Sequence, residues 1–316
     1  MIRALPPPTL LRFQTDLDAL IGPSDSRIAL AVSGGPDSLA LLLLAHAAFP
    51  GRVHAATVDH GLRPTSAAEV AFVARIAADL GVPHAGLKAE WDGGLPVSGI
   101  QGAAREARYA ALLGWCADEG IETLLTAHHA DDQAETLLMR LGRGAGLPGL
   151  LGIRAVQPMA GRQIARPLLG WRQAELAAIC AQAGLTPIDD PSNSDPRHER
   201  SRVRKLLAAS DALDPAKVAL SAAHLRDVEE AIGWLVEEVV RTRIEAAPGA
   251  TRFDAEGLPP EIQRRVLALL VPEARGSAIA RAADLLRAGR STTLAGLRLR
   301  PGRRWILAPA PPRRAN

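Results

Sequence analysis

Residues Arg27–Ser38 read RIALAVSGGPDS, and this stretch decides the fold of the first part of the chain. Its first six residues form a short apolar run of the kind that makes a buried strand. Ser33-Gly34-Gly35 ends that run, and a strongly apolar helix is expected from there to about Ala48. A strand, a glycine turn and a helix N-terminus in this order bring backbone N–H groups to one point. The stretch therefore predicts an anion-binding loop.

Strands and helices alternate outward from this loop, as in a parallel α/β sheet. Further strands are expected at Val53–Val58, His84–Lys88, Glu122–Thr126 and, as a strand pair, within Ile153–Leu169. Helices are expected from about Ser66, over Gln101–Glu119, from Asp131 or Asp132 to about Leu141, and over Gln173–Gly184. The first part of the chain is therefore predicted to be a mostly parallel sheet flanked by helices.

The pattern changes after the turn-rich, proline-bounded segment Asp189–Pro196. Beyond it the sequence predicts helices over about Glu199–Ala209, Lys217–Ala246, Pro260–Leu270 and Ala278–Ala288, and then a short β pair within Ser291–Leu307. We therefore expect an α/β domain over residues 1–212, followed by a smaller, mainly helical domain with a terminal β pair over residues 213–316.

Composition excludes several classes of protein. Hydrophobic residues make up 47% of the 316 residues and charged residues 22%, so global disorder is not expected. No apolar run approaches the roughly 20 residues that span a bilayer, so no membrane partner is expected. The two cysteines, Cys116 and Cys180, are far apart and offer neither a disulfide framework nor a zinc-ligand spacing. These features predict a reduced, cytoplasmic protein.

Positive charge is concentrated rather than large. The formal net charge is only +3, yet seven arginines and no acidic residue occur from Ala288 to Asn316. A second basic cluster comprises Arg197, Arg200, Arg202, Arg204 and Lys205. Because guanidinium groups bind phosphate well, a nucleic-acid partner is one hypothesis, and an ordinary solvated surface is the alternative.

The candidate phosphate-binding loop is Ser33-Gly34-Gly35-Pro36-Asp37-Ser38. Its glycines let the backbone approach a ligand, and its serines add hydroxyl donors. A carboxylate in an anion cradle needs a bridging cation, so Asp37 is interpreted as a magnesium ligand that acts through the phosphates of ATP. No Walker lysine follows, so this is not the loop of GTPases and kinases. The loop instead suits release of pyrophosphate from ATP.

Two further polar groups follow expected strands. Asp59 and His60 lie past the second strand, where α/β sheets bind ligands, although such an aspartate can also cap a loop. The segment His128–Glu135 (HHADDQAE) holds two histidines and three carboxylates. Asp131 and Asp132 each share a helix face with Glu135. No HExxH-like face favours zinc, and complementation of the helix dipole is the remaining alternative.

The loop SGGPDS resembles the PP-loop signature of the ATP pyrophosphatase superfamily. Further blocks resemble those of the tRNA(Ile)-lysidine synthase family, in that family's order, and together they cover roughly Arg27 to Lys205. They are TVDHGLR (57–63), IQGAAREARY (100–109), TAHHADDQAET (126–136), RGAGLPG (143–149), RPLL (166–169) and DPSNSDPRHERSRVR (190–204). The resemblance implies a Rossmann-like PP-loop domain.

The resemblance also implies a reaction, an ATP-dependent carbon–nitrogen ligation that uses Mg²⁺. ATP would adenylate the C2 oxygen of the wobble cytidine in a tRNA(Ile) with a CAU anticodon, with loss of pyrophosphate. The ε-amine of free L-lysine would then attack C2 and displace AMP, giving lysidine. The expected partners are therefore this tRNA and lysine, and a homodimer stays an open alternative.

The resemblance assigns roles to individual residues. Asp37, His128 and Arg105 are expected to be catalytic. The expected ATP-binding residues are Ser33, Gly34, Gly35, Pro36, Asp37, Ser38, Asp59 and His60. The expected lysine-binding residues are Asp132, Glu135 and Asp131, and the expected tRNA-binding residues are Arg108, Asn193, Arg200, Arg202 and Arg204. Ser201 stands where the family usually has asparagine. Arg105 and Arg108 could instead belong to a solvated face, and Tyr109 is either a core residue or a stacking platform.

Rival functions need features that the sequence lacks or does not favour. A PP-loop thiolase of cytidine or uridine needs catalytic or cluster-binding cysteines, usually as CxxC. An amidotransferase needs a glutamine-hydrolysing domain for which this length leaves no room. A non-catalytic ATP- or RNA-binding module is disfavoured because Asp37, His128, Asp132 and Glu135 are all present.

Overall fold

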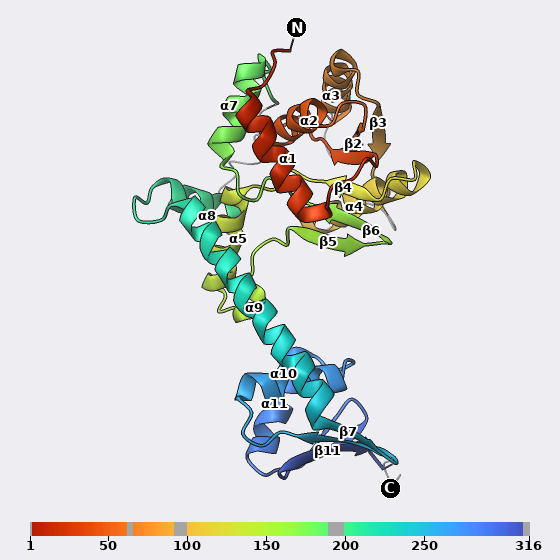
Figure 1. The fold of residues 1–316 in the computed structure, drawn as a ribbon, viewed down its shortest axis with the longest axis vertical. Helices are drawn as coiled ribbons and strands as arrows, with labels where there is room; N and C mark the ends of the chain where they lie inside the picture. The colour runs from red at the N-terminus through yellow and green to blue at the C-terminus, as the bar shows by residue number, and fades with distance from the viewer. Residues whose placement is uncertain (1, 62–65, 92–99, 189–198, 312–316) are drawn as a thin grey trace. The chain divides into compact units, whose positions relative to one another are not determined.

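The computed structural model describes residues 2–61, 66–91, 100–188 and 199–311, and Figure 1 shows the fold. The chain divides into two compact units, Met1–Leu225 and Arg226–Asn316, and the division falls inside helix α9 (Pro215–Arg243). The boundary expected at residues 212 and 213 lies just before that helix and stays a prediction. The segment Asp189–Pro196 and the candidate residue Asn193 lie outside the described residues.

A six-stranded sheet forms the centre of the first unit, with the strand order β3-β2-β1-β4-β6-β5. Its parallel strands are β1 (Ile28–Ala31), β2 (Val53–Asp59), β3 (His84–Lys88), β4 (Thr123–Leu125) and β6 (Arg162–Ala165). Only the edge strand β5 (Val156–Met159) runs antiparallel, against β6. The mostly parallel sheet predicted from the apolar runs is confirmed.

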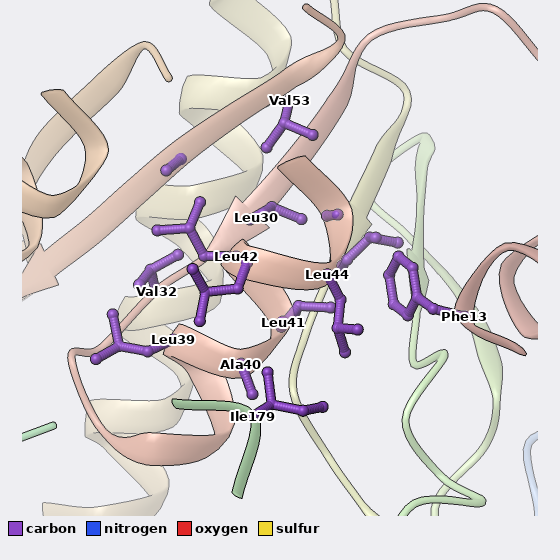
Figure 2. Packing of buried hydrophobic residues seen from close by; sticks show 14 of the residues in the cluster. Phe13, Leu30, Val32, Leu39, Ala40, Leu41, Leu42, Leu44, Val53 and Ile179 are labelled. Carbon is purple, nitrogen blue, oxygen red and sulfur yellow. The ribbon is translucent and has the colours of Figure 1, made fainter. Parts of the chain in front are cut away.

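Helices cover both faces of this sheet. One face packs against α1 (Pro7–Ile21), α2 (Pro36–Ala48), α3 (Ser66–Leu80) and α7 (Gln173–Ala183). The other face packs against α4 (Ile100–Asp118). Helix α2 is apolar all round because it is enclosed by the sheet and neighbouring helices, and Figure 2 shows its leucines between Leu30, Phe13 and Ile179. Such burial fixes the loop that precedes α2 to the rigid core.

Besides α9, the described part of the first unit contains three more helices. Helix α5 (Ala130–Gly142) follows β4, and α6 (Leu147–Leu150) is a single turn in the glycine-rich segment between α5 and β5. Helix α8 (Glu199–Ala208) packs against α5. The arrangement brings the basic block of α8 to the acidic start of α5.

The second unit contains more β structure than expected. A five-stranded antiparallel sheet has the order β7-β8-β11-β10-β9. Its strands are β7 (Ile244–Ala247), β8 (Ala250–Asp254), β9 (Thr292–Leu294), β10 (Leu297–Arg300) and β11 (Arg304–Pro309). The sheet packs with α10 (Pro260–Leu270), α11 (Gly276–Arg287) and the end of α9.

The helices and the terminal β pair predicted for this unit are present, but its sheet is larger than that pair. The pair β10 and β11 exists, but β11 also pairs with β8, so that Trp305 lies opposite Phe253. The helix expected over Lys217–Ala246 ends at Arg243, and the next residues form β7. Neither β7 nor β8 was expected: β7 pairs with the adjacent β8, and β8 is joined to the rest of the sheet only through β11, a segment far away in sequence.

Within the described ranges, no helix combines the length and the apolar character needed to cross a membrane.

Candidate active site

The loop after β1 is held in shape by its own hydrogen bonds. Ser38 Oγ accepts from the backbone N–H of Ser33 at 3.1 Å and donates to the carbonyl of Gly35 at 3.1 Å. Gly34 has φ +88°, and a Cβ there would lie 3.0 Å from Ile188 Cδ1, so a side chain would be both strained and crowded. Gly35 is the N-cap of α2, so the loop presents a helix N-terminus toward any bound anion.

Asp37 lies in the first turn of α2, directly after this loop. Its Oδ2 lies 3.5 Å from Nε2 of His129. Its Oδ1 is buried and has no hydrogen-bond partner among the residues described. A buried carboxylate oxygen without a partner is costly unless something else satisfies it. The residue therefore fits the predicted magnesium ligand, because Mg²⁺ prefers carboxylate oxygens.

His129 lies between three carboxylates. It is 2% exposed, and its ring nitrogens lie 3.5 to 3.6 Å from oxygens of Asp37, Asp131 and Asp132. Burial by itself lowers the pKa of His129, but the contacts with Asp131 and Asp37 and the charge of Asp132 outweigh it and raise the pKa to about 10. Nδ1 also lies 3.4 Å from the N–H of Asp132, which would suit a neutral ring, but three carboxylates surround the imidazole and together favour the charged form. An imidazolium here offsets the repulsion among the carboxylates.

The two neighbouring aspartates of α5 have different surroundings. Asp131 accepts hydrogen bonds from Arg172 at 3.1 to 3.3 Å and from the backbone N–H of Gln173 at 2.8 Å. Burial alone would raise the pKa of Asp131, but bonds from His129 and Arg172 hold it well below its usual range. Burial is the largest effect on Asp132 and raises its pKa. Asp131 therefore fixes the start of α7, whereas Asp132 is a carboxyl group that takes up a proton more readily than usual.

Glu135 is 1% exposed and is joined to α8 by two arginines. Arg200 Nε donates to its Oε2 at 2.7 Å, and Arg204 Nε donates to its Oε1 at 2.7 Å. Arg200 also lies 3.3 Å from Asp132. Arg202 is exposed and makes no contact with these carboxylates in the described part of the chain. Two of the acids expected to bind lysine, Asp132 and Glu135, are therefore paired with two of the arginines expected to bind tRNA.

His128 lies in a basic environment, unlike the histidine beside it. Burial and then the charges of Arg166, Arg105 and two other arginines lower the pKa of His128 to about 2, so the ring is neutral. Its Nδ1 lies 2.9 Å from Thr126 Oγ1. A neutral imidazole can exchange hydrogen bonds with a nucleobase without adding charge to the site.

Asp59 and His60 lie at the end of β2, the strand next to β1. Asp59 accepts a hydrogen bond from the backbone N–H of Gly61 at 2.7 Å. Hydrogen bonds, first from Ser66 and then from Gly61, hold the pKa of Asp59 below its usual value. The backbone carbonyl of His60 accepts from Trp91 Nε1 at 3.1 Å. These contacts match the loop-capping alternative and leave the ATP-binding role of both residues a prediction.

Parallel pairing brings most of these side chains to one edge. Strands β1, β4 and β6 are neighbours, so the PP-loop, the histidine pair and Arg166 all lie at their carboxyl ends. Sequence reasoning gave no role to His129, Arg166 or Arg172. The only signal for them was membership of the blocks TAHHADDQAET and RPLL, which resemble those of the family, or proximity to the second.

Comparison with known proteins identifies the relatives of this chain. A family model described as a PP-loop domain matches residues 9–210. A curated tRNA(Ile)-lysidine synthase of Novosphingobium aromaticivorans is 46% identical, over 96% of this chain and 95% of the relative. A second curated protein of that name, from Zymomonas mobilis, is 40% identical, over 99% of this chain and 98% of the relative.

A solved structure gives a more distant similarity. The U34-tRNA thiolase NcsA from Methanococcus maripaludis, with its [4Fe-4S] cluster, aligns with a TM-score of 0.57 at 17% identity. The alignment covers 69% of this chain and 77% of the thiolase. At this identity the likeness shows the PP-loop fold and nothing about the reaction.

Proposed function

Because this chain belongs to the tRNA(Ile)-lysidine synthase family, an ATP-dependent ligase family, we propose that it joins free L-lysine to C2 of the wobble cytidine in a tRNA(Ile) with a CAU anticodon. The observation that carries this proposal is the juxtaposition of two groups of side chains. A phosphate-binding loop with an unpartnered Asp37 oxygen lies beside carboxylates of α5 that suit an amine cation, of which Glu135 is buried and Asp132 is partly exposed.

In the first step the loop holds the triphosphate of ATP through backbone N–H groups, the N-terminus of α2 and the hydroxyls of Ser33 and Ser38. Asp37 would hold Mg²⁺, which when bound neutralises phosphate charge and orients the triphosphate. The C2 oxygen of cytidine attacks the α-phosphorus, the bond between the α- and β-phosphates breaks, and pyrophosphate leaves. The base thereby gains a good leaving group.

In the second step the ε-amine of lysine attacks C2, and AMP leaves with the former C2 oxygen. The ammonium must first lose a proton, and Asp132 is the residue we assign to accept it. Its carboxyl group has a raised pKa and lies 3.5 Å from His129, within the same cluster as Asp37. A general base is most effective when its pKa lies close to the pH at which the enzyme works.

Lysine binding at Glu135 requires an exchange of partners. Both Glu135 oxygens are paired with Arg200 and Arg204, so an incoming ammonium group replaces one guanidinium group. The displaced arginine is then available to a phosphate of the tRNA. Asp131 is bound to Arg172 and to the start of α7, so we assign lysine to Asp132 and Glu135 instead.

The remaining assignments are carried by the family resemblance. We propose that Arg105 and His128 act beside the base, and that Asp59 and His60 contribute to the ATP site. Arg108, Arg200, Arg202, Arg204 and Asn193 would contact tRNA. A cytoplasmic location and a homodimer also stay predictions.

A thiolase reaction is the nearest rival, and the two cysteines do not favour it. Cys116 and Cys180 are buried in different hydrophobic clusters. Burial raises the pKa of each thiol to about 11. These properties are opposite to those of a reactive thiolate.

Release of pyrophosphate tests the proposed first step. With ATP, Mg²⁺ and the tRNA(Ile) but no lysine, the protein is expected to release up to one pyrophosphate per tRNA. Lysine should then release AMP and permit product formation. Pyrophosphate release that needs no tRNA, or that stays unaffected by lysine, contradicts the proposal.

A further inference from the structure

We propose that Arg105, Arg108, Arg166 and the hydroxyl group of Tyr109 form a second phosphate-binding subsite, distinct from the loop Ser33–Ser38. It lies where α4 begins and where β4 and β6 end. The proposal rests on the proposed function, since the phosphate would belong to one of its two phosphate-bearing substrates, ATP or tRNA.

Arg166 is a buried cation with neutral partners. It directly follows β6, and its side chain is 1% exposed. Its guanidinium group donates to the carbonyl of Arg154 at 2.7 Å and to Oε1 of Gln157 at 3.2 Å. Its Nε is buried and has no hydrogen-bond partner among the described residues. Burying a charged group with only neutral acceptors is costly, so an anion at this position would be strongly favoured.

Tyr109 supplies a second unsatisfied donor. Its ring is 5% exposed and packs with Leu112 and Leu124 against the sheet. Its hydroxyl lies close enough to Arg108 and Arg166 to interact with both guanidinium groups, but no hydrogen bond of normal geometry reaches the buried oxygen within the part described. A buried hydroxyl that lacks a well-formed hydrogen bond recovers only part of the free energy that it loses on leaving water. A phenyl ring without the hydroxyl would pack in the core equally well, so core packing does not account for the hydroxyl.

Two more guanidinium groups lie against the same ring. The guanidinium carbons of Arg105 and Arg108 are 5.0 and 5.4 Å from the ring centroid of Tyr109. Both arginines lie in the first half of α4, so they face the carboxyl edge of the sheet. Within the described ranges, no carboxylate forms an ion pair with Arg105, Arg108 or Arg166. The neutral state of His128, which lies in the field of all three, accords with this concentration of positive charge.

Phosphate is the anion that fits this donor set. Three guanidinium groups and a phenol offer more donors than one carboxylate can accept, whereas a phosphate group presents several charged oxygens in different directions. The subsite lies on the same sheet edge as the PP-loop, so a phosphate of the triphosphate or of the tRNA backbone near the wobble base could fill it.

The sharpest test is Tyr109→Phe, which removes only the hydroxyl oxygen. The ring stays in the core and under both arginines, and no protein hydrogen bond of normal geometry is lost among the described residues. The melting temperature should therefore be unchanged or slightly higher. One arm measures the dissociation constant of Mg·ATP without tRNA, and the other that of the tRNA without ATP. We expect the affinity to fall about tenfold in one arm, the effect of a lost hydrogen bond to a charged group.

The outcomes separate the two sources of phosphate. A loss confined to the ATP arm assigns the subsite to the triphosphate, and a loss confined to the tRNA arm assigns it to the RNA backbone. Unchanged affinity in both arms, or the same loss in both, overturns the proposal.

A second variant distinguishes loss of a phosphate contact from a change in the folding of the protein. Arg105 is exposed, so Arg105→Gln should fold normally and weaken the same arm as Tyr109→Phe. Arg75→Gln, which removes an exposed arginine of α3, is the control for loss of net charge and should change neither arm. Failure of the proposed function is recognised separately, because wild-type protein would then form no lysidine even if both binding arms behave as expected.

Discussion

The charged state of His129 leads to a prediction about stability and pH. The folded protein holds the His129 proton up to a pKa of about 10, whereas an unfolded chain releases it near the ordinary histidine pKa of 6.5. The folded pKa is therefore raised. Its contribution to stability is complete below about pH 6.5 and is lost as the pH rises through about 10, at about 1.4 kcal/mol per pH unit. Across that window the full shift corresponds to about 5 kcal/mol, and because the cluster titrates as a unit we expect about 3–5 kcal/mol.

His129→Gln removes this proton while keeping a polar side chain. The free energy of unfolding, from urea denaturation followed by circular dichroism, would be measured at several values between about pH 6 and 9.5. The difference between wild type and variant should be largest near pH 6 and should shrink steadily toward high pH. His54→Gln, near the amino end of β2 and outside the carboxylate cluster, is the control and should not change the slope. If wild type and His129→Gln lose stability in parallel as the pH rises, His129 is not a cation in the folded protein.

Three further predictions concern the same site. His128 has a pKa lowered to about 2, so the stability linked to its neutral ring is present above about pH 6.5 and is lost as the pH falls. His128→Gln should therefore flatten the acid side of the stability profile in urea denaturation, and an unchanged acid slope would refute the buried neutral ring. Glu135→Gln should raise the KM for lysine at least tenfold and leave the KM for ATP within about twofold, because only the lysine site loses a charge. Steady-state kinetics with each substrate varied in turn measures both KM values, and equal changes in the two count against a lysine-binding role. Asp37→Ala should reduce tRNA-dependent pyrophosphate release by about 100-fold or more while tRNA still binds in a filter assay; lost tRNA binding with intact chemistry at saturating tRNA would contradict its assignment.

Much of the first unit could be predicted from local sequence because local patterns determine it. The apolar runs before Ser33 and Asp59 are short and end in turn residues, so they predict parallel strands with ligand-binding ends. The second unit was harder because β8 is stabilised by pairing with β11, about 50 residues later. A short stretch such as ATRFD, Ala250–Asp254, carries too little local pattern to predict that pairing.

The site was predicted in its residue types but not in its pairings. The acidic start of α5 is visible in the sequence, yet Glu135 bonds to Arg200 across 65 residues and to Arg204 across 69. Asp131 likewise bonds to Arg172 across 41 residues. These contacts depend on how α7 and α8 pack beside α5, which no local pattern encodes. The same holds for the adjacent histidines. His129 is charged because carboxylates surround it, whereas His128 is neutral because it is buried and lies near arginines.

Transfer of lysine to tRNA tests the central claim most directly. The protein would be incubated with ATP, Mg²⁺ and labelled lysine, together with either a tRNA(Ile) bearing a CAU anticodon or the tRNA(Met) with the same anticodon. We predict ATP-dependent label in the tRNA(Ile) and none in the tRNA(Met). No label in either tRNA, with protein that still binds ATP and tRNA, would contradict the account.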